Sequence, residues 1–244
     1  MELIVLGSSA SYALPGEATS GYLIRSGDES LVIDLGNGAL SNLFRWQDPA
    51  DMKALILSHT HMDHVSDLYP LRLYLSFDRP GHKLTVIAPE GASKKLSSVL
   101  SPKGKKIFDQ VLRFKSITEG ARKIGKFNVS FAKMIHDIPS FAVKIEAGRK
   151  SLVYSSDTMF NDKLVKLATN TDLLLSEATL IKKVPEVDHM TVEETARLAE
   201  KAGAKKLVLT HIWPTFKDEK TVDEAAKYYS GPIEIANVNA VYKI

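Results

Sequence analysis

The chain has 244 residues, of which 44% are hydrophobic and 25% are charged, a balance typical of a globular protein with one large or two small domains. Its formal net charge of +3 is too small to indicate a nucleic-acid-binding protein, and the absence of cysteine excludes disulfides and thiolate zinc sites. The N-terminal MELIVLGSSA has no signal-peptide pattern, and no segment reaches the ~18 apolar residues of a membrane span, so we expect a cytoplasmic protein without membrane partners.

The first half of the chain is dominated by short apolar runs, most of them next to Gly, Pro, Asn or Asp, as expected of strands that end in turns. Leu68, Leu71 and Leu75 recur at helical spacing, which predicts one helix over Ser66–Phe77. The five predicted strands of this half cover residues 3–7, 22–26, 30–36, 54–59 and 83–89.

The second half of the chain repeats the order of strands followed by helices. Two T-x-x-E capping boxes predict helix starts, Thr191–Glu194 with Gly203 as the C-terminal cap, and Thr221–Glu224 before Ala225–Tyr229. No repeat or linker divides the chain, so we expect one domain over residues 1–244. The predicted strands of this half are 128–136, 141–148, 151–157, 173–178, 206–211 and 233–244.

The stretch LSHTHMDHVSDL at residues 57–68 places four potential metal ligands within six positions, directly after an apolar run. On an extended segment His59 and His61 point the same way, so they can hold one ion, while Asp63 and His64 follow where the chain turns and can hold a second. Imidazole and carboxylate ligands suit Zn, Fe or Mn. The alternative, a merely exposed polar strand end, is disfavoured by this clustering.

The pattern H-x-H-x-D-H after a buried strand resembles the hallmark motif of the metallo-β-lactamase fold, an α+β architecture arranged as an αβ/βα four-layer sandwich. The resemblance covers the whole chain and implies three further ligands at strand ends. His136, Asp157 and His211 occur in the required order, at the ends of NVSFAKMIH, SLVYSSD and KLVLTH. The resemblance then implies one metal site of His59, His61 and His136 and a second of Asp63, His64 and His211, with Asp157 bridging.

Two divalent ions are the cofactors that this resemblance implies, with Zn as the first expectation and Mn or Fe as alternatives. Two such ions about 3.5–4 Å apart can hold a hydroxide and accept the charge of a hydrolytic transition state. We consider Ser58, Thr60 and Asp67 as groups that orient the imidazoles. Asp34, in VIDLG, is either an acid near the metals or a turn residue before Gly36, and both interpretations stay open.

Two further stretches, LLLSEATL and DHMTVEET, resemble the signatures of the tRNA 3′-processing endonuclease (ribonuclease Z) group. The resemblance implies that His189 donates a proton to the leaving group and that Glu177 orients it. We expect His189, Glu177 and Asp63 to be catalytic, with Asp63 also a metal ligand. Ser176 stands where the group usually has a histidine. The alternative for His189 is a residue that only helps to start a helix.

The group carries an arm that grips the tRNA elbow, inserted between the third histidine and the bridging aspartate. Only 20 residues separate His136 from Asp157 here, and they predict a strand, a turn and a strand, with no room for an arm. We therefore expect a short-form relative, a phosphodiesterase acting on a small or unstructured phosphodiester or nucleic-acid fragment. The alternatives are a carboxyl-ester or lactone hydrolase, or a tRNA 3′-endonuclease that uses another basic surface. A homodimer is also left open.

Positive charge is concentrated between Lys94 and Lys126, where ten Lys or Arg stand against Asp109 and Glu119. The local excess is 10 − 2 = +8, so the rest of the chain carries 3 − 8 = −5. This stretch is either a solvated surface or a basic rim that attracts a phosphate-bearing substrate. His82, in RPGHKL, is assigned to a loop.

Overall fold

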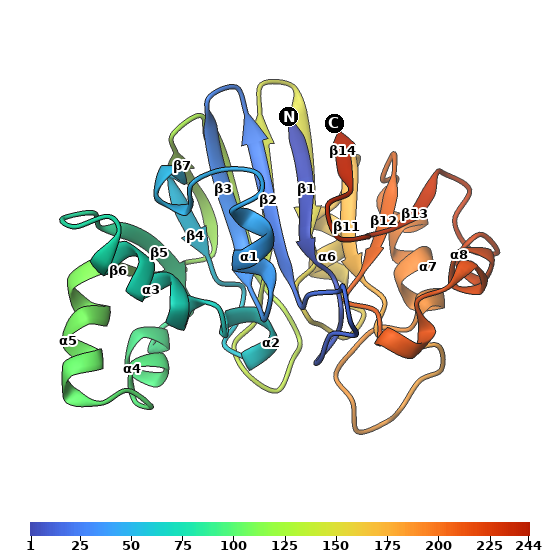
Figure 1. Ribbon diagram of the computed structural model, residues 1–244. Coiled ribbons are helices and arrows are strands. Elements are labelled where there is room, and N and C mark those ends of the chain that lie inside the picture. Colours follow the sequence, from blue (N-terminus) through green and yellow to red (C-terminus); the bar gives the residue numbers. More distant parts are fainter.

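Two seven-stranded sheets pack face to face in the computed structural model, which describes all residues 1–244. Figure 1 shows the sheets side by side, with α3, α4 and α5 outside one and α7 and α8 outside the other. The predicted metallo-β-lactamase αβ/βα sandwich is confirmed. None of the helices is long and apolar enough to cross a membrane.

The first sheet has the strand order β14-β1-β2-β3-β4-β5-β6. Its β14, β1, β2 and β3 pair antiparallel, whereas β3, β4, β5 and β6 pair parallel. Its strands are β1 (Glu2–Gly7), β2 (Gly21–Ser26), β3 (Glu29–Leu35), β4 (Ala54–Ile56), β5 (Leu84–Ala88), β6 (Leu112–Ser116) and β14 (Val241–Lys243).

The second sheet repeats this plan in the order β13-β12-β11-β10-β9-β8-β7. The strands β7 to β10 pair antiparallel and β10 to β13 pair parallel. They are β7 (Gly120–Ile124), β8 (Phe127–Lys133), β9 (Phe141–Ala147), β10 (Lys150–Tyr154), β11 (Leu173–Glu177), β12 (Leu207–Thr210) and β13 (Ile233–Ile235).

The run over residues 233–244 contains two short strands, which belong to different sheets. Ile233–Ile235 pairs with β12, and Val241–Lys243 pairs with β1. Between them Asn239 adopts a left-handed backbone with φ of 66°, a conformation that asparagine tolerates better than most residues. Its amide donates to the Val5 carbonyl, which ties the turn to β1.

The helices are α1 (Ala39–Leu43), α2 (Met62–Val65), α3 (Leu68–Phe77), α4 (Ala92–Ser97), α5 (Pro102–Val111), α6 (Asp162–Leu167), α7 (Val192–Ala202) and α8 (Glu219–Ala225). The predicted helix over Ser66–Phe77 begins two residues late, at Leu68. The capping box of α7 is confirmed: Thr191 and Glu194 exchange both hydrogen bonds, and Gly203 follows with φ of 62°.

The second predicted capping box, Thr221–Glu224, is wrong. Asp218 occupies the cap of α8, and its carboxylate accepts from the Thr221 amide. The Thr221 hydroxyl instead donates to the Phe216 carbonyl, so Thr221 lies inside the helix, and the helix ends at Ala225, where the prediction had it begin.

Three apolar clusters fill the spaces between the layers. One lies between the sheets and includes Val5, Ile33 and Leu175, and the other two pack each sheet against its own helices. Buried strands such as β4 and β12 contribute to an apolar cluster on each face, as is usual for parallel strands covered on both sides. The polar side chains that could carry out chemistry therefore lie at the strand ends.

Candidate metal centre

The seven predicted metal ligands meet at the carboxyl-terminal edge of the two sheets. Each follows or begins an element whose body is buried, so the backbone that carries it is held by the core. The four motif residues lie in the segment that follows β4 and forms α2, and the other three predicted ligands follow strands of the second sheet. The seven are His59, His61, Asp63, His64, His136 after β8, Asp157 after β10 and His211 after β12.

The first group brings His59, His61, His136 and Asp157 together, with one ligand atom from each within 4.8 Å of the others. Nε2 of His136 lies 3.2 Å from Nδ1 of His61. Nε2 of His59 lies 3.4 Å from Oδ2 of Asp157, and it is buried without a hydrogen-bond partner. Four donor atoms thus converge on one point.

The second group consists of Asp63, His64 and His211. Nε2 of His211 lies 3.2 Å from Nε2 of His64 and 3.2 Å from Oδ2 of Asp63. Oδ2 of Asp157 is 3.3 Å from Nε2 of His64 and 3.5 Å from Nε2 of His211, so this oxygen borders both groups. The structure therefore brings all seven predicted ligands together.

The rings of His64 and His136 are held with Nε2 toward the centre. Nδ1 of His64 lies 2.8 Å from the Asp34 carboxylate, and Nδ1 of His136 lies 3.1 Å from the Asp188 carbonyl. Since both partners only accept hydrogen bonds, Nδ1 carries the proton in each ring. A neutral ring then has an unprotonated Nε2, which is the metal-binding form.

The hydroxyls of Ser58 and Thr179 fix His59 and His211 in the same way. The Ser58 hydroxyl donates its one proton to Asp34, and the Thr179 hydroxyl donates its proton to Glu177. Each hydroxyl oxygen is therefore left to accept from Nδ1 of its histidine, at 3.1 Å for His59 and 2.9 Å for His211.

The spacing of the nitrogen and oxygen atoms at the centre also bears on metal binding. Adjacent lone pairs repel one another unless a cation lies between them. In a tetrahedral zinc site with bonds of about 2.0–2.1 Å, ligand atoms stand about 3.3–3.4 Å apart. The observed spacings fit such ions.

Asp34 acts from behind the ligands. Its backbone is left-handed, with φ of 55°, and its buried carboxylate accepts from the Ser58 amide, the Ser58 hydroxyl, the Tyr154 hydroxyl and His64 Nδ1. Both interpretations of Asp34 therefore hold, because it occupies a turn and also orients a ligand. Of the other candidates, Ser58 contacts an imidazole, whereas the Asp67 carboxylate binds the Leu40 amide.

The charged residues of the second group shift one another's pKa values. Burial lowers the pKa of His64, but the carboxylates of Asp157, Asp63 and Asp34 more than offset this and hold its pKa well above the usual value. Burial raises the pKa of Asp157, but His211, His64 and His59 hold it well below its usual range. A proton on His64 therefore occupies the place that a cation would take.

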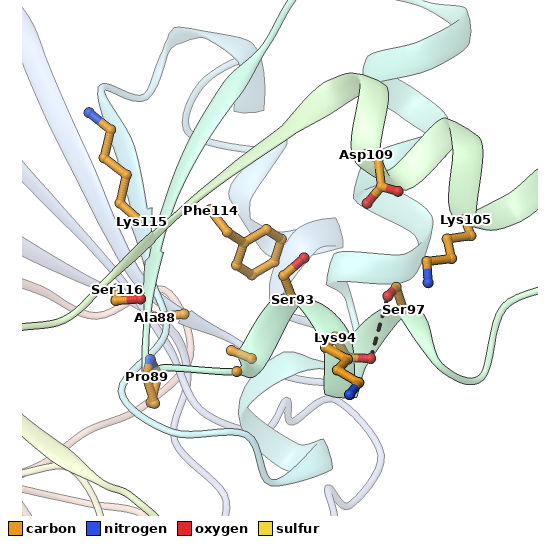
Figure 2. Close-up of a pocket in the computed structure, with 12 residues that line it drawn as sticks. Ala88, Pro89, Ser93, Lys94, Ser97, Lys105, Asp109, Phe114, Lys115 and Ser116 are labelled. Atoms are coloured by element: carbon orange, nitrogen blue, oxygen red, sulfur yellow. Dashed lines mark hydrogen bonds between the residues drawn. The ribbon is translucent and has the colours of Figure 1, made fainter.

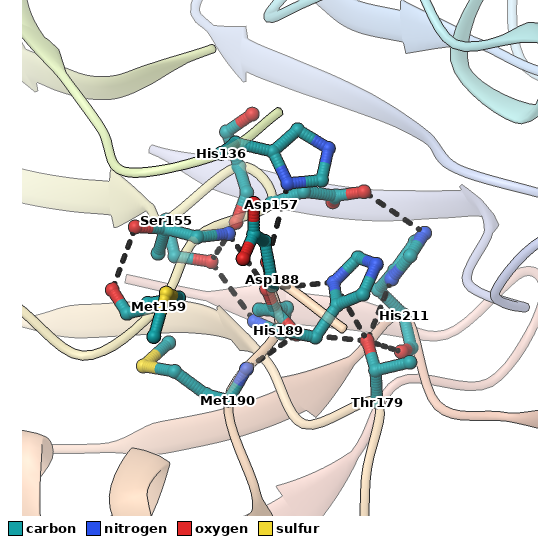
Figure 3. Close-up of polar contacts among 12 residues, drawn as sticks. His136, Ser155, Asp157, Met159, Thr179, Asp188, His189, Met190 and His211 are labelled. Carbon is teal, nitrogen blue, oxygen red and sulfur yellow. Dashed lines mark hydrogen bonds and ion pairs between the residues drawn. The ribbon is translucent and has the colours of Figure 1, made fainter. Parts of the chain in front are cut away.

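His189 lies beside the ligands, and Figure 3 shows it among His136, Asp157 and His211. Its ring centroid is 5.3 Å from that of His136 and 5.4 Å from that of His211. Nδ1 of His189 lies 3.0 Å from Oε1 of the fully buried Glu177. Burial opposes the charged ring, yet the Glu177 carboxylate raises the pKa of His189 to about 9.

Glu177 is itself fixed by three further donors. Oε1 accepts from the Thr158 amide at 2.7 Å, and Oε2 accepts from the Thr179 hydroxyl at 2.7 Å and the Met190 amide at 3.3 Å. The predicted pairing of Glu177 with His189 is thus present. His189 also lies within 4.8 Å of Asp157 and His211, so it is close enough to be a ligand as well as an acid.

Two features near the centre were missed by the sequence reasoning. One is Asp137, which is exposed and whose carboxylate lies 3.2 Å from Nε2 of His136 and 3.5 Å from Nε2 of His61.

The other is a cavity of about 360 Å³ that adjoins Asp63 and is lined by Tyr12 and Met62. The Tyr12 ring packs edge-on against Trp213 at 5.5 Å. Nothing in the sequence around Tyr12 signals this contact, which joins residues about two hundred positions apart.

Comparison with known proteins gives one family. The sequence model described as Beta-lactamase superfamily domain matches residues 30–212. The chain is 30% identical over 256 residues to the probable metallo-hydrolase YhfI of Bacillus subtilis, covering 100% of both chains. The crystal structure of YhfI matches with a TM-score of 0.89 over 99% of each chain.

Ribonucleases are also among the similar proteins. The chain is 25% identical over 268 residues to a ribonuclease Z of Mycobacterium bovis, covering 97% of this chain and 96% of that protein. The crystal structure of the short form of human tRNase Z has the same fold, with a TM-score of 0.80, 21% identity and coverage of 100% and 99%.

Proposed function

Because the chain belongs to the β-lactamase superfamily and is a metal-dependent hydrolase, we propose that it hydrolyses a small or unstructured phosphodiester, with His189 as the general acid. The observation that carries this proposal is the His189–Glu177 pair, which stands beside the ligand cluster and supplies a proton there. The resemblance to ribonucleases points to the same class of bond.

We propose that the ligand cluster holds two divalent ions, Zn in the first place, with Asp157 shared between them. His59, His61 and His136 would hold one, and Asp63, His64 and His211 the other. Such ions would activate a water molecule and stabilise negative charge on the phosphate. Since both sheets contribute ligands, we also propose that residues 1–244 act as one domain.

The role of His189 follows from its two nitrogens. Nδ1–H donates to Glu177, which fixes the ring plane, and the charged ring carries its second proton on Nε2. A pKa of about 9 keeps the ring protonated at neutral pH, so Nε2–H can be given to a departing oxygen. Glu177 is a positioning residue, because it acts through His189.

The chain segment between His136 and Asp157 bears on substrate size. It contains β9, a turn at Gly148 and β10, which form a plain antiparallel hairpin. No extended arm leaves the fold there, which supports a substrate that needs no grip on a distant part of a folded RNA.

A substrate panel tests the proposal. Purified protein with its metal content measured would be assayed on bis-p-nitrophenyl phosphate, p-nitrophenyl phosphate, p-nitrophenyl acetate and a lactone. We expect kcat/KM to be highest on the diester. A higher value on the lactone or the acetate would instead assign the protein to carboxyl-ester chemistry, and efficient 3′ cleavage of precursor tRNA would make it an endonuclease that needs no arm.

A further inference from the structure

A cavity of about 370 Å³ lies between α4, α5 and β6, outside the metal centre. Figure 2 shows the side chains that line it, Lys94 and Lys105 near Ser97, and Phe114 beside Ser93. We call it the α4–β6 pocket. Its charged lining residues are Lys94, Lys105, Lys115 and Asp109. Neighbouring side chains on a strand point to opposite faces, and Figure 2 shows the Lys115 side chain directed away from Phe114 and the helices, so two cations, Lys94 and Lys105, face the pocket beside one anion.

The lysines of this pocket have no acidic partner. Between Lys94 and Lys126 only one of the ten basic residues makes an ion pair, Lys126 with Asp28. Between Lys163 and Lys227, by contrast, eight of the eleven basic residues are paired with an acid. The ammonium groups around the pocket are therefore available to an anion that comes from outside the chain.

The pocket also offers an aromatic face and free hydroxyls. Phe114 is half-buried and stacks on the core residue Phe108 at 5.4 Å with an interplanar angle of 19°. The hydroxyls of Ser93 and Ser116 make no hydrogen bond within the chain. Lysines that follow a phosphate backbone, next to an aromatic ring on which a base stacks, are the combination by which proteins bind single strands.

The pocket and the metal centre share one edge of the first sheet. β4, β5 and β6 run parallel, so their carboxyl ends meet at this edge, with His59 beyond β4 and the pocket beyond β5 and β6. Two strand spacings separate β4 from β6, about 10 Å. Lys95, the neighbour of Lys94 on α4, donates to the Thr60 hydroxyl at 2.9 Å, between the ligands His59 and His61. The short helix α4 therefore connects the two places.

We infer that the α4–β6 pocket binds a nucleotide unit of a single-stranded nucleic acid whose reactive phosphodiester lies at the metal centre. This inference rests on the proposed function and narrows its substrate class to oligonucleotides. Lys94 and Lys105 contact backbone phosphates, and Phe114 stacks on an unpaired base. A duplex would not place a base on Phe114, since its bases are already stacked and paired.

Direct binding tests the inference apart from catalysis. The probe is a fluorescent oligothymidylate of about ten nucleotides. Its phosphorothioate linkages keep the charge and resist hydrolysis, and fluorescence anisotropy of the metal-loaded protein gives Kd. The test variant combines Lys94→Gln and Lys105→Gln. The matched control combines Lys150→Gln and Lys166→Gln, which are exposed lysines without ion pairs on other faces.

We expect the pocket variant to weaken binding about tenfold or more and to flatten the dependence of log K on log salt by roughly 1.4, from two lost phosphate contacts. The control should stay within about twofold of wild type, and Phe114→Leu alone should weaken binding about fivefold. Catalysis on bis-p-nitrophenyl phosphate should be unchanged in all three variants.

An equal loss in the control, an unchanged Kd in the pocket variant, or equal competition by polyglutamate of the same charge would overturn the inference. None of these results bears on the proposed function, which fails separately if the wild-type protein hydrolyses no diester.

Discussion

Oδ2 of Asp34 lies 2.8 Å from Nδ1 of His64, and the same carboxylate holds Ser58, whose hydroxyl in turn accepts from His59. One buried acid thus sets the ring orientation of a predicted ligand in each of the two groups. The chain places it there by a left-handed turn directly at the end of β3.

Asp34→Asn should weaken metal binding without removing a ligand. An amide can accept from only some of the four donors that now surround the carboxylate, and it offers a donor to a ring nitrogen that is itself a donor. We expect an affinity loss of about 10–100-fold, the usual cost of losing a partner behind a metal ligand. Competition with a chromogenic chelator would measure it.

Asp67→Asn is the matched control for this variant. Asp67 is also buried and near the motif, but its carboxylate binds the Leu40 amide and no imidazole. It should lower thermal stability while leaving metal affinity near the wild-type value. Equal affinity losses in the two variants would show that Asp34 acts only through the general stability of the fold.

Asp157→Ala should remove at least one metal ion per chain and nearly all hydrolysis. Its Oδ2 borders both ligand groups, at 3.4 Å from His59 Nε2 and 3.3 Å from His64 Nε2. Elemental analysis after gel filtration, together with the diester assay, measures both effects. If the active wild-type protein contains a single ion, a two-ion mechanism is wrong.

His189→Ala should lower kcat on diesters with alkoxide leaving groups by roughly 10²–10⁴, the usual contribution of a positioned acid. The loss should shrink for p-nitrophenolate, which leaves without a proton. Metal content should stay at the wild-type level. Equal losses on both kinds of substrate would assign His189 to phosphate binding, and loss of metal would make it a ligand, as its distance to Asp157 and His211 permits.

Metal affinity should fall as the pH falls. In the metal-free protein the carboxylates around His64 hold its pKa well above the usual value, so the ring is protonated, and metal binding must displace that proton. Because metal binding releases this proton, metal affinity rises at higher pH and falls at lower pH. Calorimetry in buffers of different ionisation enthalpy would count the protons, and no release at neutral pH would contradict the prediction.

The ligand set could be predicted from the sequence because each ligand stands at the end of a buried strand, where apolar runs and polar residues meet in one pattern. The resemblance implied three further ligands at strand ends, and His136, Asp157 and His211 were the residues found there; Glu177 was likewise paired with His189 by resemblance. The structure brings all of these residues together at one edge. The assignment of roles to them remains a prediction.

Other features depend on contacts between distant parts of the chain, which no local pattern encodes. Thr221 and Asp218 are both good helix caps, and only the packing of α8 decides between them. The helices α4 and α5 carry many lysines, and their place beside the metal edge was not predicted, because it depends on how β5 and β6 pair in the sheet. The contact between Tyr12 and Trp213 is of the same kind.

The pairing of β14 with β1 has a consequence for biosynthesis. On the edge of β1 that faces away from β2, Glu2, Leu3 and Ile4 pair only with Lys243, Tyr242 and Val241. Until β14 has been translated, β1 is therefore an open edge of the first sheet, and apart from Glu2 its residues are apolar. Open edges of this kind recruit foreign strands. We expect ribosome-bound chains stalled before residue 241 to aggregate or to recruit chaperones.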